Sequence, residues 1–307
     1  MTSLYIQTDG DSRFSGGNSY ALSTEERDAW AYFDRLADDK KAVWIDPRAT
    51  SLHKYLGVSD SPARARIIDR CGDRVFTRVS ELDRHPILME EAGKPIFLFG
   101  AGGVSPNELS SSSNGAMICA DGVDGRGVGD NNPDVWVPGV GWSAAWKSKL
   151  PVPSTTVNGV AFGSATGGFV FGNATTADDT SSGGVGNSLS TGRAEIHTKS
   201  SGSNASLGGS TDRRDSAWHD YIMTYNPATT TLRIWEDGVA VTPNTAATDD
   251  VSTATGSSKI MLGARGRQSG GPTGRFIGFL AYACWLQGPV FESAAARAAI
   301  RALMATR

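Results

Sequence analysis

Acidic side chains are the first residues of this sequence whose chemistry matters. Two carboxyl groups held about 5 Å apart can cleave a glycosidic bond, one as the nucleophile and the other as the acid and base. The candidates are Glu195 and the adjacent pair Glu236 and Asp237. Asp237 is followed by Gly238, and an Asp-Gly dipeptide between two β-prone runs is typical of a two-residue hairpin turn. A turn accounts for Asp237, and we predict that the protein is not an enzyme and has no catalytic residue.

Histidine could act as a general base, but the sequence gives this chemistry little support. A serine hydrolase needs a nucleophile on a sharp turn and a histidine oriented by a carboxylate. The chain contains no Gly-x-Ser-x-Gly motif, and its four histidines are His53, His85, His197 and His219. Asp220 follows His219, but neighbouring residues of a strand point to opposite faces of a sheet. We therefore predict that His219 is a structural residue of a sheet.

Oxygen ligands that could hold a metal ion are concentrated in one glycine-rich segment. Asp121, Asp124, Asp130 and Asp134 lie there together with two asparagines. Calcium prefers such oxygen ligands, although the spacing does not match the EF-hand loop. A calcium site is one interpretation of this segment and a solvated turn is the other; we expect no further cofactor.

One pair of side chains in a predicted hairpin suggests a binding surface. Strand alternation places Leu232 and Ile234 on one face, and Arg233 and Trp235 on the other. If the first face belongs to the core, Arg233 and Trp235 form a surface where a guanidinium and an aromatic ring could contact a glycan or a partner protein. Ordinary packing between two sheets is the alternative.

Composition limits the classes of function. The chain has 307 residues and a formal charge of -3, without a basic stripe, so nucleic acid is not an expected partner. Cys71, Cys119 and Cys284 lie far apart, which favours buried free thiols and synthesis in a reducing cytoplasm. The N-terminus lacks the pattern of a signal peptide. The longest apolar stretch, residues 276–291, is interrupted and too short to cross a bilayer, so we expect no membrane insertion.

The N-terminal residues predict an arm followed by a helix. Residues 1–22 are polar and glycine-rich, with one β-prone patch at Leu4, Tyr5 and Ile6. Ser23 and Glu26 have the spacing of a capping box, and apolar residues that include Trp30 and Phe33 then recur at helical intervals. We predict a helix from residue 24 to about residue 38. Its apolar stripe must pack against the domain that follows or against a neighbouring subunit.

From residue 42 onward, short β-prone runs alternate with turn-forming clusters, which is typical of an antiparallel β-protein. The clearest unit is a three-stranded meander between Trp218 and Val241, with Asn-Pro and Asp-Gly at its turns. Trp142 and Trp146 share one face of an earlier strand and are expected in the core. The Ser/Gly/Thr-rich residues 173–191 and 198–210 are expected to be loops.

The order of these segments resembles that of the concanavalin A-like jelly roll, in particular its laminin-G or pentraxin-like branch. Domains of this family carry a Trp-His strand, a strand ending in Asp-Gly, a Leu-Gly strand, and a closing strand followed by a short helix. The corresponding segments are residues 218–219, 232–238, 260–263, 278–286 and 293–304. Residues 43–46, 69–72 and 93–96 match a pattern common in bacterial and phage members. The resemblance implies an all-β sandwich of two antiparallel sheets over residues 42–307, preceded by the arm and helix of residues 1–41.

The same resemblance implies binding rather than catalysis. Glycoside hydrolases of this fold usually carry a Glu-x-Asp-x-x-Glu arrangement, which this chain lacks. Many relatives are phage virion proteins, so we predict a non-catalytic capsid decoration or appendage subunit on the virion surface, as an oligomer or within a larger assembly. Residues 1–41 would contact other virion proteins, and the sandwich should fold without them. The alternatives are a carbohydrate-binding module and a divergent glycan-cleaving enzyme. The residues expected to mediate assembly are Leu4, Tyr5, Ile6, Trp30 and Phe33.

Overall fold

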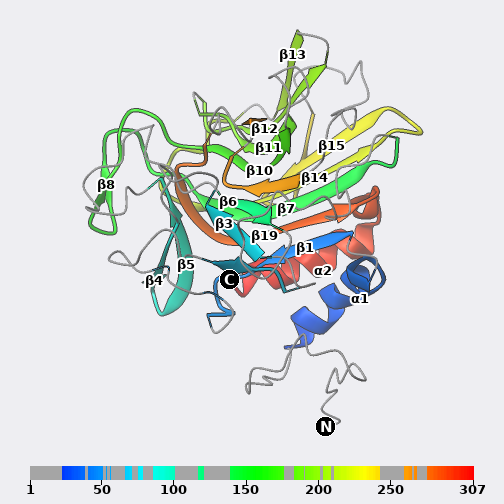
Figure 1. Cartoon of the computed structure of the whole chain (residues 1–307), viewed down its shortest axis with the longest axis horizontal. Helices are drawn as coiled ribbons and strands as arrows, with labels where there is room; N and C mark the ends of the chain where they lie inside the picture. The colour runs from blue at the N-terminus through cyan, green and yellow to red at the C-terminus, as the bar shows by residue number, and fades with distance from the viewer. Residues whose placement is uncertain are drawn as a thin grey trace.

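The computed structural model contains two antiparallel β-sheets that face each other, with helices outside one of them (Figure 1). It describes residues 23–38, 41–50, 53, 56, 66–70, 75–78, 86–100, 117–120, 139–175, 183–189, 191–200, 203–208, 211–242, 259–264, 266–267 and 275–307. Leu4, Tyr5 and Ile6, and the four aspartates of the predicted calcium site, lie outside the described residues.

The first sheet has eight strands. Seven are ordered β16 (Val239–Val241), β15 (Thr231–Glu236), β14 (Trp218–Asn226), β7 (Trp142–Lys149), β19 (Gly278–Gln287), β5 (Lys94–Phe99) and β4 (Ile87–Glu91). The eighth, β1 (Ala42–Ile45), also pairs with β19. Strands β14, β15 and β16 confirm the predicted meander, with its Asp-Gly turn between β15 and β16.

The second sheet has nine strands. Eight are ordered β13 (Ser203–Gly208), β12 (Ala194–Ser200), β11 (Gly183–Asn187), β10 (Gly168–Thr175), β17 (Lys259–Leu262), β6 (Met117–Ala120), β3 (Val75–Arg78) and β2 (Ile67–Ile68). The ninth, β18 (Gly266–Arg267), runs parallel to β10. A separate small hairpin joins β8 (Thr156–Val157) and β9 (Val160–Ala161).

The chain crosses repeatedly between the two sheets. It passes from β5 in the first sheet to β6 in the second, and then back to β7 in the first. Late strands are inserted between early ones, because β17 lies between β10 and β6 while β19 lies between β7 and β5. These crossings are those of a jelly roll, and they confirm the predicted all-β sandwich.

Aromatic residues fill the space between the sheets. Trp142 and Trp146 of β7 are both 0% exposed, as predicted from their shared face. Trp146 stacks on Tyr221 of the neighbouring strand, with ring centroids 5.1 Å apart. Trp142 stacks in the same way on Trp285 of β19 at 5.0 Å. Because the alternate residues of these strands face inward, this part of the core follows directly from the sequence pattern.

Helices cover the outer face of the first sheet, where α1 (Thr24–Asp38) lies beside β1 and β19, and α2 (Ala294–Ala305) lies beside α1, β7 and β14 (Figure 1). A short 3-10 helix, η4 (Val290–Glu292), precedes α2.

The predicted capping box at the start of α1 is confirmed, since Ser23 N–H donates to Glu26 Oε2 at 2.8 Å and Glu26 N–H donates to Ser23 Oγ at 3.2 Å. Within the described residues, no helix is long and apolar enough to cross a membrane.

The apolar stripe of α1 packs against the sandwich itself. Phe33 is 1% exposed, and its ring centroid lies 4.9 Å from that of Trp44 in β1. Trp30 lies 5.8 Å from the same tryptophan ring. Of the two partners considered for this stripe, the helix therefore uses the domain that follows it. The predicted role of Trp30 and Phe33 in assembly stays a prediction, and both side chains already have intramolecular contacts.

The prediction that residues 173–191 and 198–210 are loops is wrong for strands β11 and β13 and for parts of β10 and β12. Glycine is depleted in strands, so the glycine-rich composition of residues 183–187 did not predict a strand there. A Cβ atom at Gly186 would lie 2.3 Å from the carbonyl oxygen of Gly168. Glycine is present in β11 because the backbones of β10 and β11 approach closely.

Candidate functional site

The Asp-Gly turn at the end of β15 brings a carboxylate next to the start of β14. Asp237 and Gly238 have φ values of 50° and 80°, the left-handed conformation that such a turn requires. Asp237 Oδ1 accepts a hydrogen bond of 3.0 Å from the backbone N–H of Asp220. Asp237 Oδ2 lies 2.8 Å from His219 Nδ1. The turn aspartate therefore also fixes the side chain of His219.

A second carboxylate contacts the other nitrogen of the same ring. Asp215 Oδ2 lies 3.0 Å from His219 Nε2, and Asp215 Oδ1 accepts a hydrogen bond of 2.9 Å from the backbone N–H of Ala217. Burial alone would raise the pKa of Asp215, but the N–H of Ala217 and the ring of His219 outweigh it and hold that pKa below its usual value. The side chain of His219 is 10% exposed, whereas those of Asp215 and Asp237 are 49% and 41% exposed.

An arginine connects this group to a buried glutamate. Arg213 Nε donates to Glu236 Oε2 at 3.1 Å, and its Nη1 lies 3.7 Å from Asp237 Oδ2. Glu236 is 1% exposed, and its Oε1 has no hydrogen-bond partner among the described residues. We call Arg213, Asp215, His219, Glu236 and Asp237 the hairpin-end site.

Helix α2 supports the hairpin-end site from the outer face of the sheet. Arg301 Nη2 donates to the main-chain oxygen of Asp237 at 3.1 Å. Lys147, which is paired with Asp220 in the register of β7 and β14, donates to the main-chain oxygens of Met304 at 2.9 Å and Arg307 at 3.0 Å. Burial lowers the pKa of Lys147. The cation lies at the C-terminal end of α2, where the helix dipole favours positive charge.

His219 lies buried in strand β14, where sequence analysis placed it as a structural residue of a sheet. His219 and Asp220 do point to opposite faces, but Asp215 and Asp237 supply the carboxylates that Asp220 cannot. The register of the β14–β15 hairpin could have revealed Asp237, because it pairs Glu236 with Tyr221 and so brings the turn that follows Glu236 close to His219. Asp215 lies before β14 in an irregular segment, and no sequence pattern places it.

The predicted contact pair occupies the outer face of β15. Arg233 is exposed, while Trp235 is half-buried against the helices. The guanidinium of Arg297 from α2 lies 4.3 Å from the centroid of the Trp235 ring. One face of that ring is therefore covered by a cation, and the role of Arg233 and Trp235 as a binding surface stays a prediction.

The other predicted site residues are dispersed. Glu195 lies on β12 of the second sheet, whereas Glu236 lies on β15 of the first, where Arg213 binds it. Within the part of the chain that the structure describes, no group of three or more His, Cys, Asp and Glu side chains could hold a metal ion. Calcium binding at Asp121, Asp124, Asp130 and Asp134 stays a prediction, because these residues lie outside that part.

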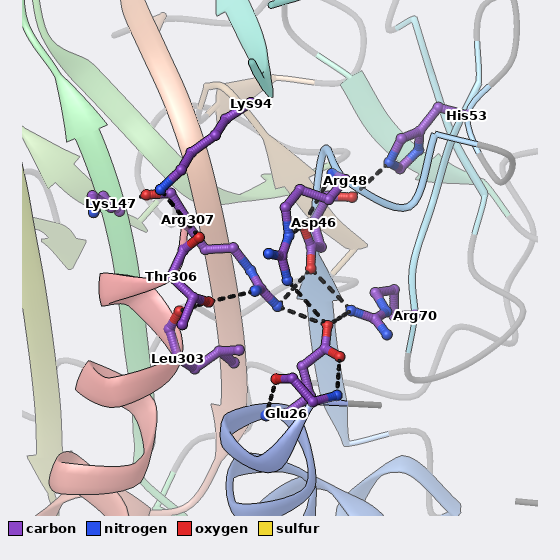
Figure 2. A network of polar contacts seen from close by, with 11 residues as sticks. Glu26, Asp46, Arg48, His53, Arg70, Lys94, Lys147, Leu303, Thr306 and Arg307 are labelled. Carbon is purple, nitrogen blue, oxygen red and sulfur yellow. Dashed lines mark hydrogen bonds and ion pairs between the residues drawn. The ribbon is translucent and has the colours of Figure 1, made fainter. Parts of the chain in front are cut away.

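A second polar cluster joins α1, β1 and the end of α2 (Figure 2). Glu26 Oε1 accepts hydrogen bonds from Arg307 at 3.0 Å, Arg70 at 3.1 Å and Arg48 at 3.2 Å. Asp46 Oδ2 lies 2.9 Å from both Arg70 and Arg307. We call Glu26, Asp46, Arg48, Arg70 and Arg307 the buried ion network. No local sequence pattern predicts it, because its members come from four separate segments.

Burial shapes the electrostatics of this network. The side chains of Arg307, Asp46 and Glu26 are 0%, 1% and 3% exposed. Burial raises the pKa of Asp46, against the opposing effect of Arg70 and Arg48. Burial also acts to raise the pKa of Glu26, but the N–H of Ser23 and the guanidinium of Arg70 outweigh it and hold this pKa below its ordinary value. The carboxylates of the network are therefore shielded from water, while Arg48 is 32% exposed.

Comparison with known proteins gives a likeness to lectin-like domains and no family. No family model matches the chain. No curated protein matches it either. The CBM40 domain of Ruminococcus gnavus IT-sialidase bound to alpha2,3 sialyllactose is 11% identical, with a TM-score of 0.38, over 50% of this chain and 77% of that one. The leech intramolecular trans-sialidase is 15% identical, with a TM-score of 0.38, over 50% of this chain and 22% of that one.

Domains LG4-5 of the mouse laminin alpha1 chain are 14% identical, with a TM-score of 0.34, over 48% of this chain and 35% of that one. Similarity at this level describes an arrangement of strands over half of the chain and carries no information about its ligand.

Proposed function

We propose that this chain is a non-catalytic carbohydrate-binding domain that recognises sugar hydroxyl groups at the hairpin-end site. The observation that carries the proposal is the pair of half-exposed carboxylates, Asp215 and Asp237, which a single buried histidine holds in place. A carboxylate is an acceptor-only group, and a hydrogen bond to it is stronger than one between neutral partners. Acceptors fixed in advance lose little entropy when a ligand binds.

The charges at the site favour a neutral or amino-bearing glycan. Arg213 is already bonded to Glu236, and the neighbouring Arg214 is bonded to Asp212. Asp212 is 46% exposed, so the surface beside the site also presents a carboxylate. A ligand carboxylate would meet like charge here, whereas hydroxyl and ammonium groups would meet acceptors.

The same geometry argues against acid-base catalysis by His219. A general base needs a free ring nitrogen within reach of the group that it deprotonates. Both nitrogens of His219 contact carboxylates. Glu236, which sequence analysis considered as a catalytic carboxylate, is 1% exposed and accepts a hydrogen bond from Arg213. Binding is therefore the function that these residues support better.

The predicted virion role assigns assembly to residues 1–41, of which α1 packs on its own sandwich through Phe33. Placement on a virion surface, and contact with other virion proteins there, stay predictions.

A glycan array probed with the full chain tests the proposal. We expect binding to neutral or amino-bearing oligosaccharides, lost in Asp215→Asn and Asp237→Asn. Asparagine keeps the volume of aspartate and tolerates the left-handed conformation at position 237. Asp212→Asn is the matched control, because it removes a neighbouring carboxylate outside the site, and it should bind normally.

Two outcomes would redirect the proposal. Binding that survives both substitutions but disappears in Trp235→Ala would move the site to the outer face of β15. Binding to no glycan by the folded wild-type protein would remove the function altogether.

A further inference from the structure

His219 is bonded in a way that only one protonation state satisfies. Its Nδ1 lies 2.8 Å from Asp237 Oδ2, and its Nε2 lies 3.0 Å from Asp215 Oδ2. Both partners are carboxylate oxygens, which accept hydrogen bonds. A neutral imidazole carries one N–H and one lone pair, whereas the doubly protonated ring donates from both nitrogens. A neutral ring would therefore direct a lone pair at one of the two carboxylates.

His53 shows the opposite arrangement in the same molecule. Its Nδ1 accepts a hydrogen bond of 3.4 Å from the backbone N–H of Ile68, and its Nε2 lies 2.9 Å from the carbonyl oxygen of Asp46. One acceptor and one donor are needed there, and a neutral ring supplies both. The two histidines therefore differ in their partners: His219 faces two acceptors, whereas His53 faces one acceptor and one donor.

The charges around His219 are mostly negative. Asp215 and Arg213 face it from the segment before β14, and Glu236 and Asp237 face it from β15 and its turn. Its own strand supplies Asp220 and the buried Tyr221, and β7 places the uncharged Ser148 opposite it, with Lys147 directed to α2. Arg301 of α2 bonds the main chain of Asp237. Around the ring itself, the carboxylates of Asp215, Glu236 and Asp237 outnumber the guanidinium of Arg213.

We propose that His219 is a proton-controlled clamp that joins the segment 211–217 to the Asp237-Gly238 turn and thereby assembles the hairpin-end site. The doubly protonated ring holds Asp215 and Asp237 at a fixed spacing. Loss of one proton breaks one of the two contacts and leaves the contacts of Arg213 with Glu236 and Asp237 to join the segment 211–217 to β15 and its turn, so the segment is held less tightly. The effect on ligand binding rests on the proposed carbohydrate function, whereas the clamp itself does not.

The direction of the pH effect follows from the two bonds. Histidine ordinarily changes charge between about pH 5 and pH 8. The pKa of Asp215 is held below its usual value, so this carboxylate is still ionised at the acidic end of that range. The clamp is therefore closed while the ring carries both protons and opens when it loses one, which is the direction of rising pH.

Hydrogen exchange on the full chain tests the clamp without any ligand. Protection of residues 211–217, corrected for the intrinsic pH dependence of exchange, should fall by about threefold or more between about pH 5.5 and pH 8.5, as expected for a partly exposed ion pair. His219→Gln has a single amide nitrogen in place of two ring nitrogens and no titrating group, so the protection of residues 211–217 should be low at both pH values. Strand β19 provides the internal control, because the protection of its buried amides should be the same in the wild type and in His219→Gln.

Binding to the glycan identified on the array separates the two proposals. Wild-type affinity should fall over the same pH interval, while His219→Gln should bind weakly at both values. Equal protection of residues 211–217 at both pH values would overturn the clamp and leave the binding site intact. Altered protection in a protein that binds no glycan would keep the clamp and remove the carbohydrate function.

Discussion

Glu26 accepts a hydrogen bond of 3.0 Å from Arg307 although 281 positions separate the two residues. The glutamate belongs to the capping box that starts α1, and Arg307 follows α2. One carboxylate therefore caps a helix at one end of the sequence and binds a guanidinium at the other. The two helices are joined through this contact on the outer face of the first sheet.

Loss of the Arg307 charge should be strongly destabilising. In Arg307→Met the carboxylates of Glu26 and Asp46 lose one of their cations inside a shielded site. Removing one partner of a buried ion pair costs about 3–5 kcal/mol. Urea unfolding should show this decrease in the free energy of unfolding, while Arg233→Met, an exposed arginine on β15, should change it by less than about 0.5 kcal/mol. Equal stability of the two variants would contradict the network.

Glu26 should make stability depend on pH in the acidic range. Its folded-state pKa is held below the ordinary value, so its stabilising contribution is fully present above about pH 4.3 and is lost as the pH falls through the folded-state pKa. The difference in unfolding free energy between wild type and Glu26→Gln should become smaller as the pH is lowered through this range. Urea titrations from pH 6 to acid measure it. A difference that grows on acidification would reverse the assigned direction.

Removal of residues 1–41 should weaken the sandwich, contrary to what the sequence suggests. The deletion exposes the face of Trp44 that Phe33 and Trp30 cover and takes Glu26 from Arg70 and Arg307. Phe33→Ala alone should lower the unfolding free energy by about 3–5 kcal/mol. Deleting residues 1–22 is the control, since it keeps the whole of α1. A deletion of residues 1–41 with wild-type stability would show that the helix contributes nothing to the fold.

Cys284 should be chemically inert in the folded protein. It is 0% exposed in β19, and burial raises the pKa of its thiol to about 12. The thiolate is the reactive form, so almost none is present at neutral pH. In a Cys71→Ser, Cys119→Ser variant, an aromatic disulfide reagent should titrate no thiol until denaturant is added and one thiol afterwards. Rapid reaction without denaturant would mean that β19 opens readily.

Local patterns predicted the elements whose signals lie within a few residues. The capping box at Ser23 and Glu26 fixed the start of α1, and the Asp-Gly dipeptide fixed the turn between β15 and β16. Alternation along β7 placed Trp142 and Trp146 in the core. In each case the physical cause, a cap, a left-handed turn or a strand face, is contained in the segment itself.

Features built from distant segments could not be predicted in this way. Strand β11 is glycine-rich because β10 passes close to it, and that neighbour is known only from the sheet order. The hairpin-end site needs Asp215, which lies in an irregular segment before β14. The Trp235 ring looked available from its strand face, but Arg297 of α2 lies over it.

Strand β19 determines when the first sheet can be completed. It pairs through hydrogen bonds with β1, β5 and β7. Within the described residues, β1 has no other partner strand. Those three strands are made by residue 149, whereas β19 begins at residue 278. During synthesis the ribosome must therefore add about 130 more residues before the centre of this sheet can close. Until then the backbone groups of β1 and β7 that pair with β19 have no native partner, and a chain that stops short of residue 278 would be expected to associate with other chains through these edges.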